Sequence, residues 1–273
     1  MSFVPNAQNE KKIGPLSIQR GSGQFTMIVD YHVHIGPFFG NLMFEPEYVA
    51  HILTQLNVDK WVYFSTAFSC EPRNYIAWFQ ECVERMEKVA PGRGIPMLWM
   101  NEAMLTHADL YFKHPFRGIK IHEGFEKLST AARETAFALA SAEKCPLVIH
   151  TGEHVCCQAG RYDDLCQRYA DVCIILAHGR PLNQAMSLLK KHSNVLLDSA
   201  FMPPEQMQIL ANTGLANRVL FGSDFPVQHH FYPHADISAL WKEHRNSSAS
   251  ILGEGIDFCM NLDIRNDYLI LPR

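Results

Sequence analysis

Short apolar runs alternate with helical patterns along most of the chain. The runs are nearly continuous in valine, isoleucine, leucine and phenylalanine, which is typical of strands buried on both faces. They predict eight strands, at residues 29–36, 60–65, 94–100, 117–122, 145–151, 172–178, 194–199 and 218–224. Between the strands, apolar residues recur at the spacing of one helix face, as at Val49, Ile52, Leu53 and Leu56.

Prolines mark several of the expected helix starts. Pro46 and Pro72 each precede a helical pattern, and proline suits the first position of a helix. An aromatic loop is expected at 37–44, before the first of these helices. Further helices are expected at 108–112, 130–143 and 203–212, and a weaker one, interrupted by glycine, at 248–260. Each predicted strand is therefore followed by a helical pattern.

Strict alternation of strands and helices predicts a parallel sheet. Eight such units in one chain of 273 residues match a closed (β/α)8 barrel, the TIM barrel, in the α/β class. An open, doubly wound sheet is the alternative, but no glycine-rich phosphate-binding loop follows the first strand. We expect a single domain at residues 26–262, with a lead-in at 1–25 and a tail at 263–273.

The first strand carries the most distinctive pattern of polar residues. Side chains alternate along a strand, so Asp30, His32 and His34 are expected to point the same way. Two imidazoles on one strand face can bind one metal ion, and an aspartate beside them can fix the tautomer of a ring. The alternative is a pair of ordinary histidines at a strand end.

The other strands also end in side chains that can carry chemistry. In a barrel of this kind the active site lies at the carboxyl ends of the strands, so these side chains are expected to meet at one mouth. They are types that bind Zn²⁺ and similar divalent ions or that move protons. The set comprises His32, His34, Lys120, His122, His150, His178 and Asp224.

Composition excludes several classes of function. The net charge is −4 and no block of lysine and arginine stands out, which argues against binding to nucleic acid or to an anionic membrane. No apolar run reaches the ~18 residues of a membrane span, and no apolar signal segment is present, so a cytoplasmic location is expected. None of the eight cysteines forms a C-x-x-C pair, but Cys156 and Cys157 follow a candidate site loop.

Four segments, taken as an ordered set, resemble the amidohydrolase superfamily of metal-dependent hydrolases. They read VDYHVH at 29–34, VIHTG at 148–152, LAHG at 176–179 and FGSDFP at 221–226. The residues of these segments are most similar to the amidohydrolase-related branch, which includes aminocarboxymuconate-semialdehyde decarboxylase, resorcylate-type decarboxylases and dicarboxylate lactonases. The resemblance covers residues 28–262, and it implies a barrel with a catalytic metal site.

The resemblance also implies roles for individual residues. His32, His34, His150 and Asp224 are expected to bind one divalent ion, for which Zn²⁺ is the expected identity. His178 is expected beside the metal-bound water, where it would hydrogen-bond the water or polarise a substrate carbonyl. Asp224 would take a proton from that water and return it to the leaving group.

Lys120 leaves two interpretations open. In binuclear members of the superfamily, a lysine on the fourth strand is carbamylated and bridges two metal ions. A second ion with a carbamylated Lys120 is therefore one hypothesis. In the other, Lys120 is a plain ammonium that binds substrate or pairs with a carboxylate, for which Glu123 and Glu153 are the candidates.

The loops that follow the strands are expected to bind the substrate. Arg180 or Arg73 could hold a substrate carboxylate through a guanidinium fork. Glu153 is a further expected substrate contact, and His122 is expected to contact the substrate or transfer a proton, or else only to line the mouth. The leading hypothesis is hydrolysis of an amide, lactone or ester bond in a small molecule. The alternatives are non-oxidative decarboxylation of a small carboxylic acid on the same site and a non-catalytic binding protein. A homodimer is the expected assembly.

Overall fold

Strands and helices alternate along the chain in the computed structural model, which describes residues 27–38, 42–66, 71–112, 115–253, 261–263 and 268–270. The strands are β1 (Val29–Phe38), β2 (Leu42–Phe44), β3 (Lys60–Ser65), β4 (Gly94–Trp99), β5 (Ile119–Ile121), β6 (Leu147–His150), β7 (Ile174–Ala177), β8 (Val195–Asp198), β9 (Val219–Leu220), β10 (Asn261–Asp263) and β11 (Tyr268–Ile270). The helices are α1 (Pro46–Gln55), α2 (Pro72–Val89), α3 (Glu102–Thr106), α4 (Ala108–Tyr111), α5 (Thr130–Ala142), α6 (Asp163–Arg168), α7 (Leu182–Lys191), α8 (Pro204–Asn212), α9 (Gln228–Phe231) and α10 (Ile237–Leu252).

The parallel strands close into a barrel. Strand β1 pairs in parallel with β3, and each strand from β3 to β9 pairs in parallel with the next. Backbone hydrogen bonds then join β1 to the segment that follows β9, from Tyr31 N to the Phe221 oxygen at 2.8 Å and from His34 N to the Phe225 oxygen at 2.7 Å. The predicted single-domain α/β fold, a (β/α)8 TIM barrel, is confirmed.

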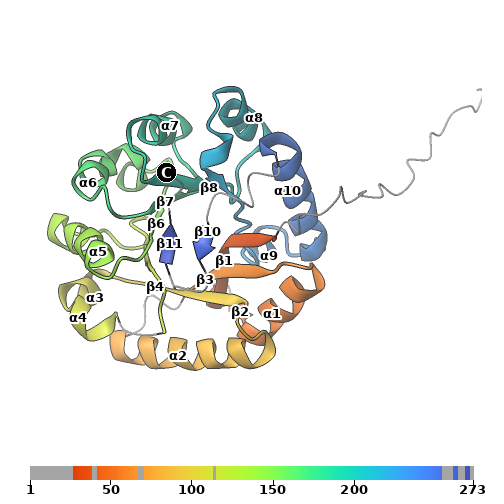
Figure 1. Cartoon of the computed structure of the whole chain (residues 1–273). Coiled ribbons are helices and arrows are strands. Elements are labelled where there is room, and N and C mark those ends of the chain that lie inside the picture. The colour runs from red at the N-terminus through yellow and green to blue at the C-terminus, as the bar shows by residue number, and fades with distance from the viewer. Residues whose placement is uncertain are drawn as a thin grey trace, which may run out of the picture.

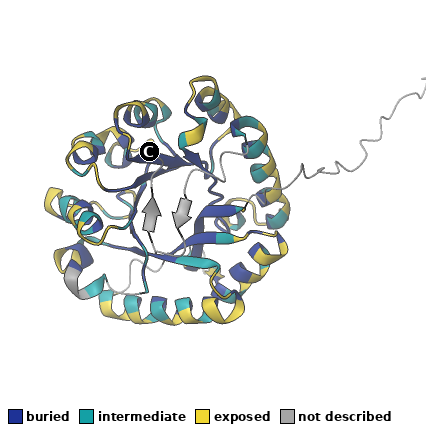
Figure 2. Ribbon diagram, in the orientation of Figure 1, coloured by how far each residue is buried: buried dark blue, intermediate teal, exposed yellow. Residues whose placement is uncertain are grey.

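The helices surround the barrel as an outer ring (Figure 1). Their inner faces and most of the residues of β1 and of β3 to β9 are buried, while their outer faces are exposed (Figure 2). Strand residues such as Val33, Leu176 and Leu197 are fully buried, as the near-continuous apolar runs predicted. Complete burial of one such side chain contributes roughly 1.5–3 kcal/mol. The core therefore lies inside the barrel and between the strands and the helices.

Two local features differ from the sequence prediction. The segment expected as a loop at 37–44 contains the end of β1 and the short strand β2, which pair antiparallel as a hairpin. The separate weak helix expected at 248–260 is also wrong, because residues 248–252 are the last part of α10. That helix ends at Gly253, whose φ of +84° is a conformation that glycine adopts without strain. Residues 254–260 lie outside the described part of the chain.

The predicted ends of the domain are only partly described. The lead-in expected at 1–25 lies outside the described residues. Strands β10 and β11 pair with each other across the predicted boundary between 262 and 263, which stays a prediction. No described helix has the length and apolar character that a membrane crossing requires.

Candidate metal centre

Three side chains from β1 and from the turn after β9 converge at the carboxyl ends of the strands. The Nε2 atoms of His32 and His34 are 3.1 Å apart, and Asp224 Oδ1 lies 2.8 Å from His34 Nε2 and 3.4 Å from His32 Nε2. All three side chains are buried. Two ligand atoms about 2.1 Å from one tetrahedral Zn²⁺ lie roughly 3.4 Å apart, so the observed spacing fits one ion.

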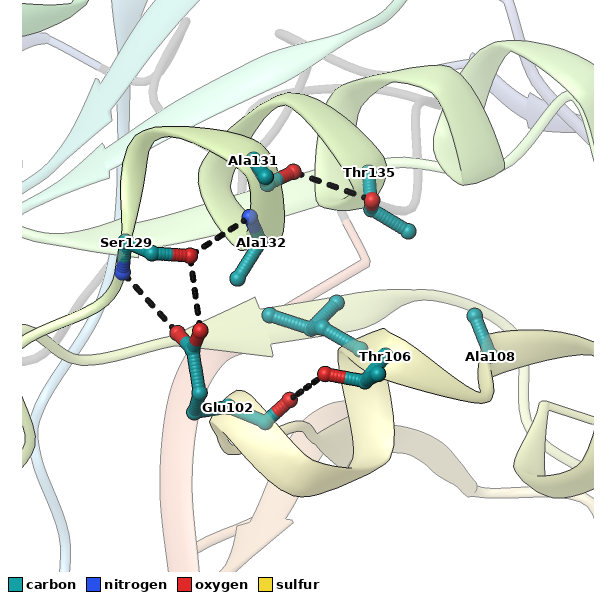
Figure 3. Close-up of a pocket in the computed structure, with 8 residues that line it drawn as sticks. Glu102, Thr106, Ala108, Ser129, Ala131, Ala132 and Thr135 are labelled. Carbon is teal, nitrogen blue, oxygen red and sulfur yellow. Dashed lines mark hydrogen bonds between the residues drawn. The ribbon is translucent and has the colours of Figure 1, made fainter.

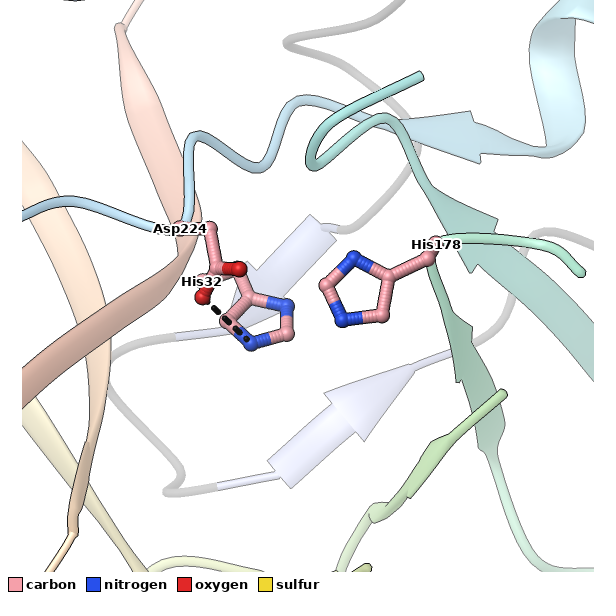
Figure 4. Close-up of side chains that lie close together, drawn as sticks. All are labelled: His32, His178 and Asp224. Carbon is pink, nitrogen blue, oxygen red and sulfur yellow. Dashed lines mark ion pairs between the residues drawn. The ribbon is translucent and has the colours of Figure 1, made fainter. Parts of the chain in front are cut away.

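His178 reaches the same point from the end of β7. Ligand-type atoms of His32, His178 and Asp224 also lie within 4.8 Å of one another (Figure 4). His178 Nδ1 lies 3.0 Å from the Ala200 carbonyl oxygen, to which it donates a hydrogen bond. The neutral ring therefore keeps a lone pair on Nε2. His178 was predicted beside the metal, and this geometry puts it among the candidate ligands.

The backbone at these two strand ends adopts an uncommon conformation. His178 and Asp224 have φ values of +67° and +60°, in the left-handed region that side chains other than glycine rarely occupy. Such conformations cost on the order of 1–3 kcal/mol and are concentrated at functional sites. Both side chains are thereby turned into the mouth of the barrel.

Asp198 at the end of β8 is a candidate site residue that the sequence prediction missed. Its Oδ2 accepts a hydrogen bond from His32 Nδ1 at 2.8 Å, and its Oδ1 accepts one from the His178 backbone N at 3.0 Å. This is the contact that was expected from Asp30. The available signal was the position of Asp198, which ends a predicted strand as Asp224 does.

Asp30 does not face the histidines because β1 contains an irregularity. Opposite β3, Asp30 pairs with Trp61 but Val33 pairs with Tyr63, so β1 holds one extra residue between these two points. The extra residue shifts the alternation of side chains. Asp30 instead accepts hydrogen bonds from Ser223 Oγ at 2.6 Å and from Trp241 Nε1 at 2.8 Å. It therefore links β1 to α10, and the prediction that it orients His32 is wrong.

Lys120 is fully buried beside the candidate ligands. Its Nζ lies 3.5 Å from His32 Nε2 and 4.7 Å from the centre of the Phe64 ring. Burial lowers the pKa of Lys120 to about 8. Neither predicted carboxylate pairs with it, because Glu123 binds Arg133 Nε at 2.8 Å and Glu153 is exposed.

The protonation states of the cluster suit a metal ion. Burial, together with the Lys120 charge, lowers the pKa of His32 to about 4, and burial lowers that of His178. Although burial alone would raise the pKa of Asp224, the neighbouring His32 and His34 hold it well below its usual range. Neutral imidazoles and an ionised carboxylate are the forms in which these groups bind metal.

His150 lies next to the cluster, not in it. Its ring centre is 4.8 Å from that of His178 and 3.5 Å from that of His122, with which it stacks at 11°. The ring of His122 also stacks on Trp99, with 5.1 Å between the ring centres. His122 Nδ1 accepts a hydrogen bond from Gly124 N at 3.1 Å. His150 as a ligand and His122 as a substrate contact stay predictions.

The remaining predicted substrate contacts lie in different environments. Arg180 is half-buried, and its Nη2 donates to the Phe201 oxygen at 2.8 Å, which ties the loop after β7 to the loop after β8. Arg73 is exposed in the first turn of α2. Glu153 is exposed in the loop after β6. Within the described part of the chain, no hydrogen bond or ion pair links these three side chains to His32, His34, His178 or Asp224.

A pocket in the outer ring of helices is a separate feature. It lies between α3 and α5, where Glu102 accepts hydrogen bonds from the backbone N and the Oγ of Ser129 (Figure 3). Thr106 Oγ1 in turn donates to the Glu102 backbone oxygen at 2.9 Å. These polar groups satisfy one another, and the pocket does not contain strand ends.

Solved structures share the fold at low sequence identity. A probable 2-pyrone-4,6-dicarboxylic acid hydrolase from Acinetobacter baumannii aligns with a TM-score of 0.57 and 11% identity, over 89% of this chain and 96% of that one. An amidohydrolase 2 from Bifidobacterium longum subsp. infantis aligns with 0.61 and 15%, over 89% and 97%. A 4-oxalomesaconate hydratase from Rhodopseudomonas palustris aligns with 0.53 and 13%, over 85% and 97%.

The sequence comparisons settle the family. No curated protein matches the chain. The family model described as amidohydrolase, in contrast, matches residues 29–250, which span the barrel from β1 into α10 and include every candidate ligand. The chain is therefore an enzyme of the amidohydrolase family.

Proposed function

We propose that this enzyme hydrolyses an amide, lactone or ester bond of a small molecule with the help of one divalent ion, Zn²⁺. The ion is held by His32, His34 and Asp224, and His150 or His178 completes its ligands. One observation carries the proposal: two imidazole nitrogens and a carboxylate oxygen, all buried, lie 2.8–3.4 Å apart. A buried carboxylate so close to two imidazoles gains a partner when a cation joins them.

A divalent ion at this point supplies a positive charge that polarises a substrate carbonyl and lowers the pKa of a coordinated water toward ~7. The protein supplies the proton transfers. Asp224 is ionised, so its carboxylate can accept the proton that the attacking water loses and then return it to the leaving group. This exchange requires no other acid in the mouth.

The tautomer of His178 selects one of its two predicted roles. Because Nδ1 donates to the Ala200 oxygen, the neutral ring has no proton on Nε2. Nε2 can accept a hydrogen bond from the attacking water, but it cannot donate one to a substrate carbonyl. We therefore assign His178 to orienting the water, unless it binds the ion directly through the same atom.

A binuclear site is the alternative for the cofactor. Carbamylation joins a neutral amine to CO₂ and releases one proton, so it requires a lysine that loses its proton readily. The lowered pKa of Lys120, about 8, meets this requirement, and Lys120 Nζ lies 3.5 Å from His32 Nε2. Two ions per chain, of which Lys120→Met loses one, would establish this alternative, whereas a count that Lys120→Met leaves unchanged would make Lys120 a substrate-binding or positioning group.

Decarboxylation receives less support from the geometry. It needs a cation that holds the substrate carboxylate, and the predicted candidate Arg180 already donates to the Phe201 oxygen. The structural neighbours do not separate the two reactions, because they include a probable hydrolase, a hydratase and a decarboxylase, the IDCase of Metarhizium anisopliae. The homodimer and the cytoplasmic location remain predictions, and size-exclusion chromatography tests the first of them.

Elemental analysis of protein purified without chelator, combined with a screen of lactones, cyclic amides and aromatic carboxylic acids, tests the proposal. We expect one Zn²⁺ per chain that depends on His34, and acid release from a lactone or amide, without CO₂. His34→Ala should lose the ion and the activity. His51→Ala is the matched control, because His51 is exposed on α1 and bonds Gln55. A His34→Ala protein with a full complement of metal would refute the site, and CO₂ release would favour the decarboxylase.

A further inference from the structure

Two adjacent thiols lie in the loop after β6, outside the cluster described above. Cys156 and Cys157 end the short 3-10 helix Val155–Cys157, and both are free cysteines. Their Sγ atoms are 3.5 Å apart. Cys156 Sγ also lies 2.9 Å from Nδ1 of His154 and 3.3 Å from the Glu123 backbone oxygen. Cys156 Sγ therefore has a second sulfur and an imidazole nitrogen within 3.5 Å.

The pair is poorly suited to a disulfide. Adjacent Cα atoms are about 3.8 Å apart, whereas the Cα atoms of a disulfide are usually at least ~4.4 Å apart. The two sulfurs nevertheless have nearly the separation that one soft cation requires. With a zinc–sulfur distance of ~2.3 Å and tetrahedral geometry, two thiolates on one ion lie about 3.8 Å apart.

The imidazole is available as a ligand. His154 is exposed, and its Nδ1 accepts a hydrogen bond from the Cys156 backbone N at 3.5 Å, so this nitrogen carries a lone pair. The same lone pair faces the Cys156 thiol. Cys156 is half-buried and gives access from solvent, while Cys157 is buried behind it. A cation can therefore enter from the His154 side.

The loop is already held in place around these atoms. Gly152 N donates to the Cys157 oxygen at 3.0 Å, and Arg161 Nη1 donates to the Cys156 oxygen at 2.8 Å. Arg161 also lies 3.7 Å from a carboxylate oxygen of Glu123, which offsets its positive charge next to the thiols. A site with fixed backbone loses less conformational entropy when it binds an ion.

We propose that Cys156, Cys157 and His154 form a second cation site, which binds a soft divalent ion such as Zn²⁺ or Cd²⁺ through two thiolates and one imidazole. When the ion binds, each thiol loses one proton to solvent and each sulfur forms one bond to the ion. Burial raises the pKa of Cys157 to about 12, so the ion has to displace its proton. Soft sulfur ligands distinguish this site from the candidate metal centre, whose described ligands are nitrogen and oxygen.

Titration of the metal-depleted full-length protein with Cd²⁺ tests the proposal, with the sulfur-to-cadmium charge-transfer absorption in the ultraviolet as the readout. Cadmium on His and Asp ligands gives no such band, so the candidate metal centre is silent. We expect a saturable band in the wild type and none in the Cys156→Ser, Cys157→Ser double variant. His154→Ala should weaken Cd²⁺ binding by at least about tenfold, the lower end of the cost of losing a supporting group.

Cys145→Ser is the matched control, because Cys145 is also half-buried but lies before β6. It should leave the band unchanged. Because Cys157 is buried and its replacement could disturb the fold, Cys156→Ser alone, with an unchanged circular dichroism spectrum, should still lose at least half of the band. A wild type without the band, a band that persists in the double variant, or a band that Cys145→Ser removes would each overturn the site.

Discussion

The two sides of the barrel mouth hold their side chains by different means. On the side of β1 and of β7 to β9, His32 is fixed by a hydrogen bond to Asp198, and His178 by one to the Ala200 oxygen. On the side of β5 and β6, the rings of His122 and His150 stack in parallel, and the only hydrogen bond to either ring that the described residues show is the one from Gly124 N to His122 Nδ1. Hydrogen bonds fix the direction of a lone pair, whereas stacking fixes only the plane of a ring.

This difference indicates that the two sides of the mouth have different functions. A metal ion needs ligands with fixed tautomers and directions, and their supporting hydrogen bonds tune its affinity. A substrate pocket needs flat surfaces that exclude water and tolerate small shifts of the ring. The hydrogen-bonded side is therefore the side that we expect to hold the ion, and the stacked side is the one that we expect to contact the substrate.

Replacement of Asp224 should have the largest effect on activity and on metal binding. Asp224→Asn removes both a negative ligand and the group proposed to carry the proton. Proton transfer by a positioned side chain is worth about 10²–10⁴-fold in rate, so we expect kcat to fall by at least that range and the bound metal to be lost. Asp164→Asn is the control, because Asp164 is exposed on α6. Retention of metal and kcat in Asp224→Asn would contradict the assignment.

Asp198 should have the next largest effect, although it touches no substrate. Asp198→Asn should lower metal affinity about 10–100-fold, because the His32 tautomer is no longer fixed by a charge. Despite burial, the neighbouring His32 lowers the pKa of Asp198 to about 2 from 3.8. A lowered carboxyl pKa gives stability that is present above about pH 4 and is lost as the pH falls to about 2.

The size of this acid-sensitive contribution is about 2 kcal/mol. Urea denaturation of metal-depleted wild type and Asp198→Asn, compared at neutral pH and near pH 3, measures it directly. The difference between the two proteins should be smaller at the acid pH. A difference that does not change with pH would show that Asp198 acts only through packing.

Lys120 should behave in the opposite way, because its burial costs stability. The folded pKa is about 8 and the ordinary value is 10.5. Between these values the unfolded chain keeps a proton that the folded chain has lost, so stability rises with pH in that window. Lys120→Met should therefore stabilise the metal-depleted protein at pH 7 by about 1–3 kcal/mol, and less as the pH rises above 8.

Urea denaturation at neutral and alkaline pH, combined with activity at neutral pH, tests this expectation. Lys120→Met should lose activity while it gains stability, as expected of a charge that is kept buried for function. Lys127→Met is the control, since Lys127 is exposed. A Lys120→Met protein that is less stable at pH 7 would mean that contacts such as the one with the Phe64 ring outweigh the cost of burial.

Much of this arrangement could be predicted from local rules. Proline restricts the backbone, so α1 and α2 begin at the predicted Pro46 and Pro72. Parallel strands place all their carboxyl ends at one mouth, so the predicted His32, His178 and Asp224 do meet there. These predictions depend only on the order of strands and helices along the chain and on the backbone preferences of single residues.

The errors come from features that leave no trace in local patterns. The extra residue of β1 turns Asp30 away from His32, yet an alternating sequence reads the same with or without it. Asp198 takes the place of Asp30 from a strand that is distant in the sequence, and only the closed barrel brings it to His32. The stacking of His122 on His150 likewise depends on neighbouring strands, although both residues were identified.

Replacement of His122 should have the smallest effect on activity, and it tests directly how the stacked side acts. If His122 acts through its flat ring, His122→Ala should cost no more than about tenfold in kcat/KM, because one aromatic pair is worth roughly 0.5–1.5 kcal/mol. His122→Phe keeps a flat ring between Trp99 and His150 and should restore most of the activity. If His122 instead transfers a proton or hydrogen-bonds the substrate, His122→Phe should be as poor as His122→Ala. Metal content should stay unchanged in both variants, because the ion is assigned to the hydrogen-bonded side of the mouth. Loss of the ion would show that the stacked rings also shape the metal site through His150.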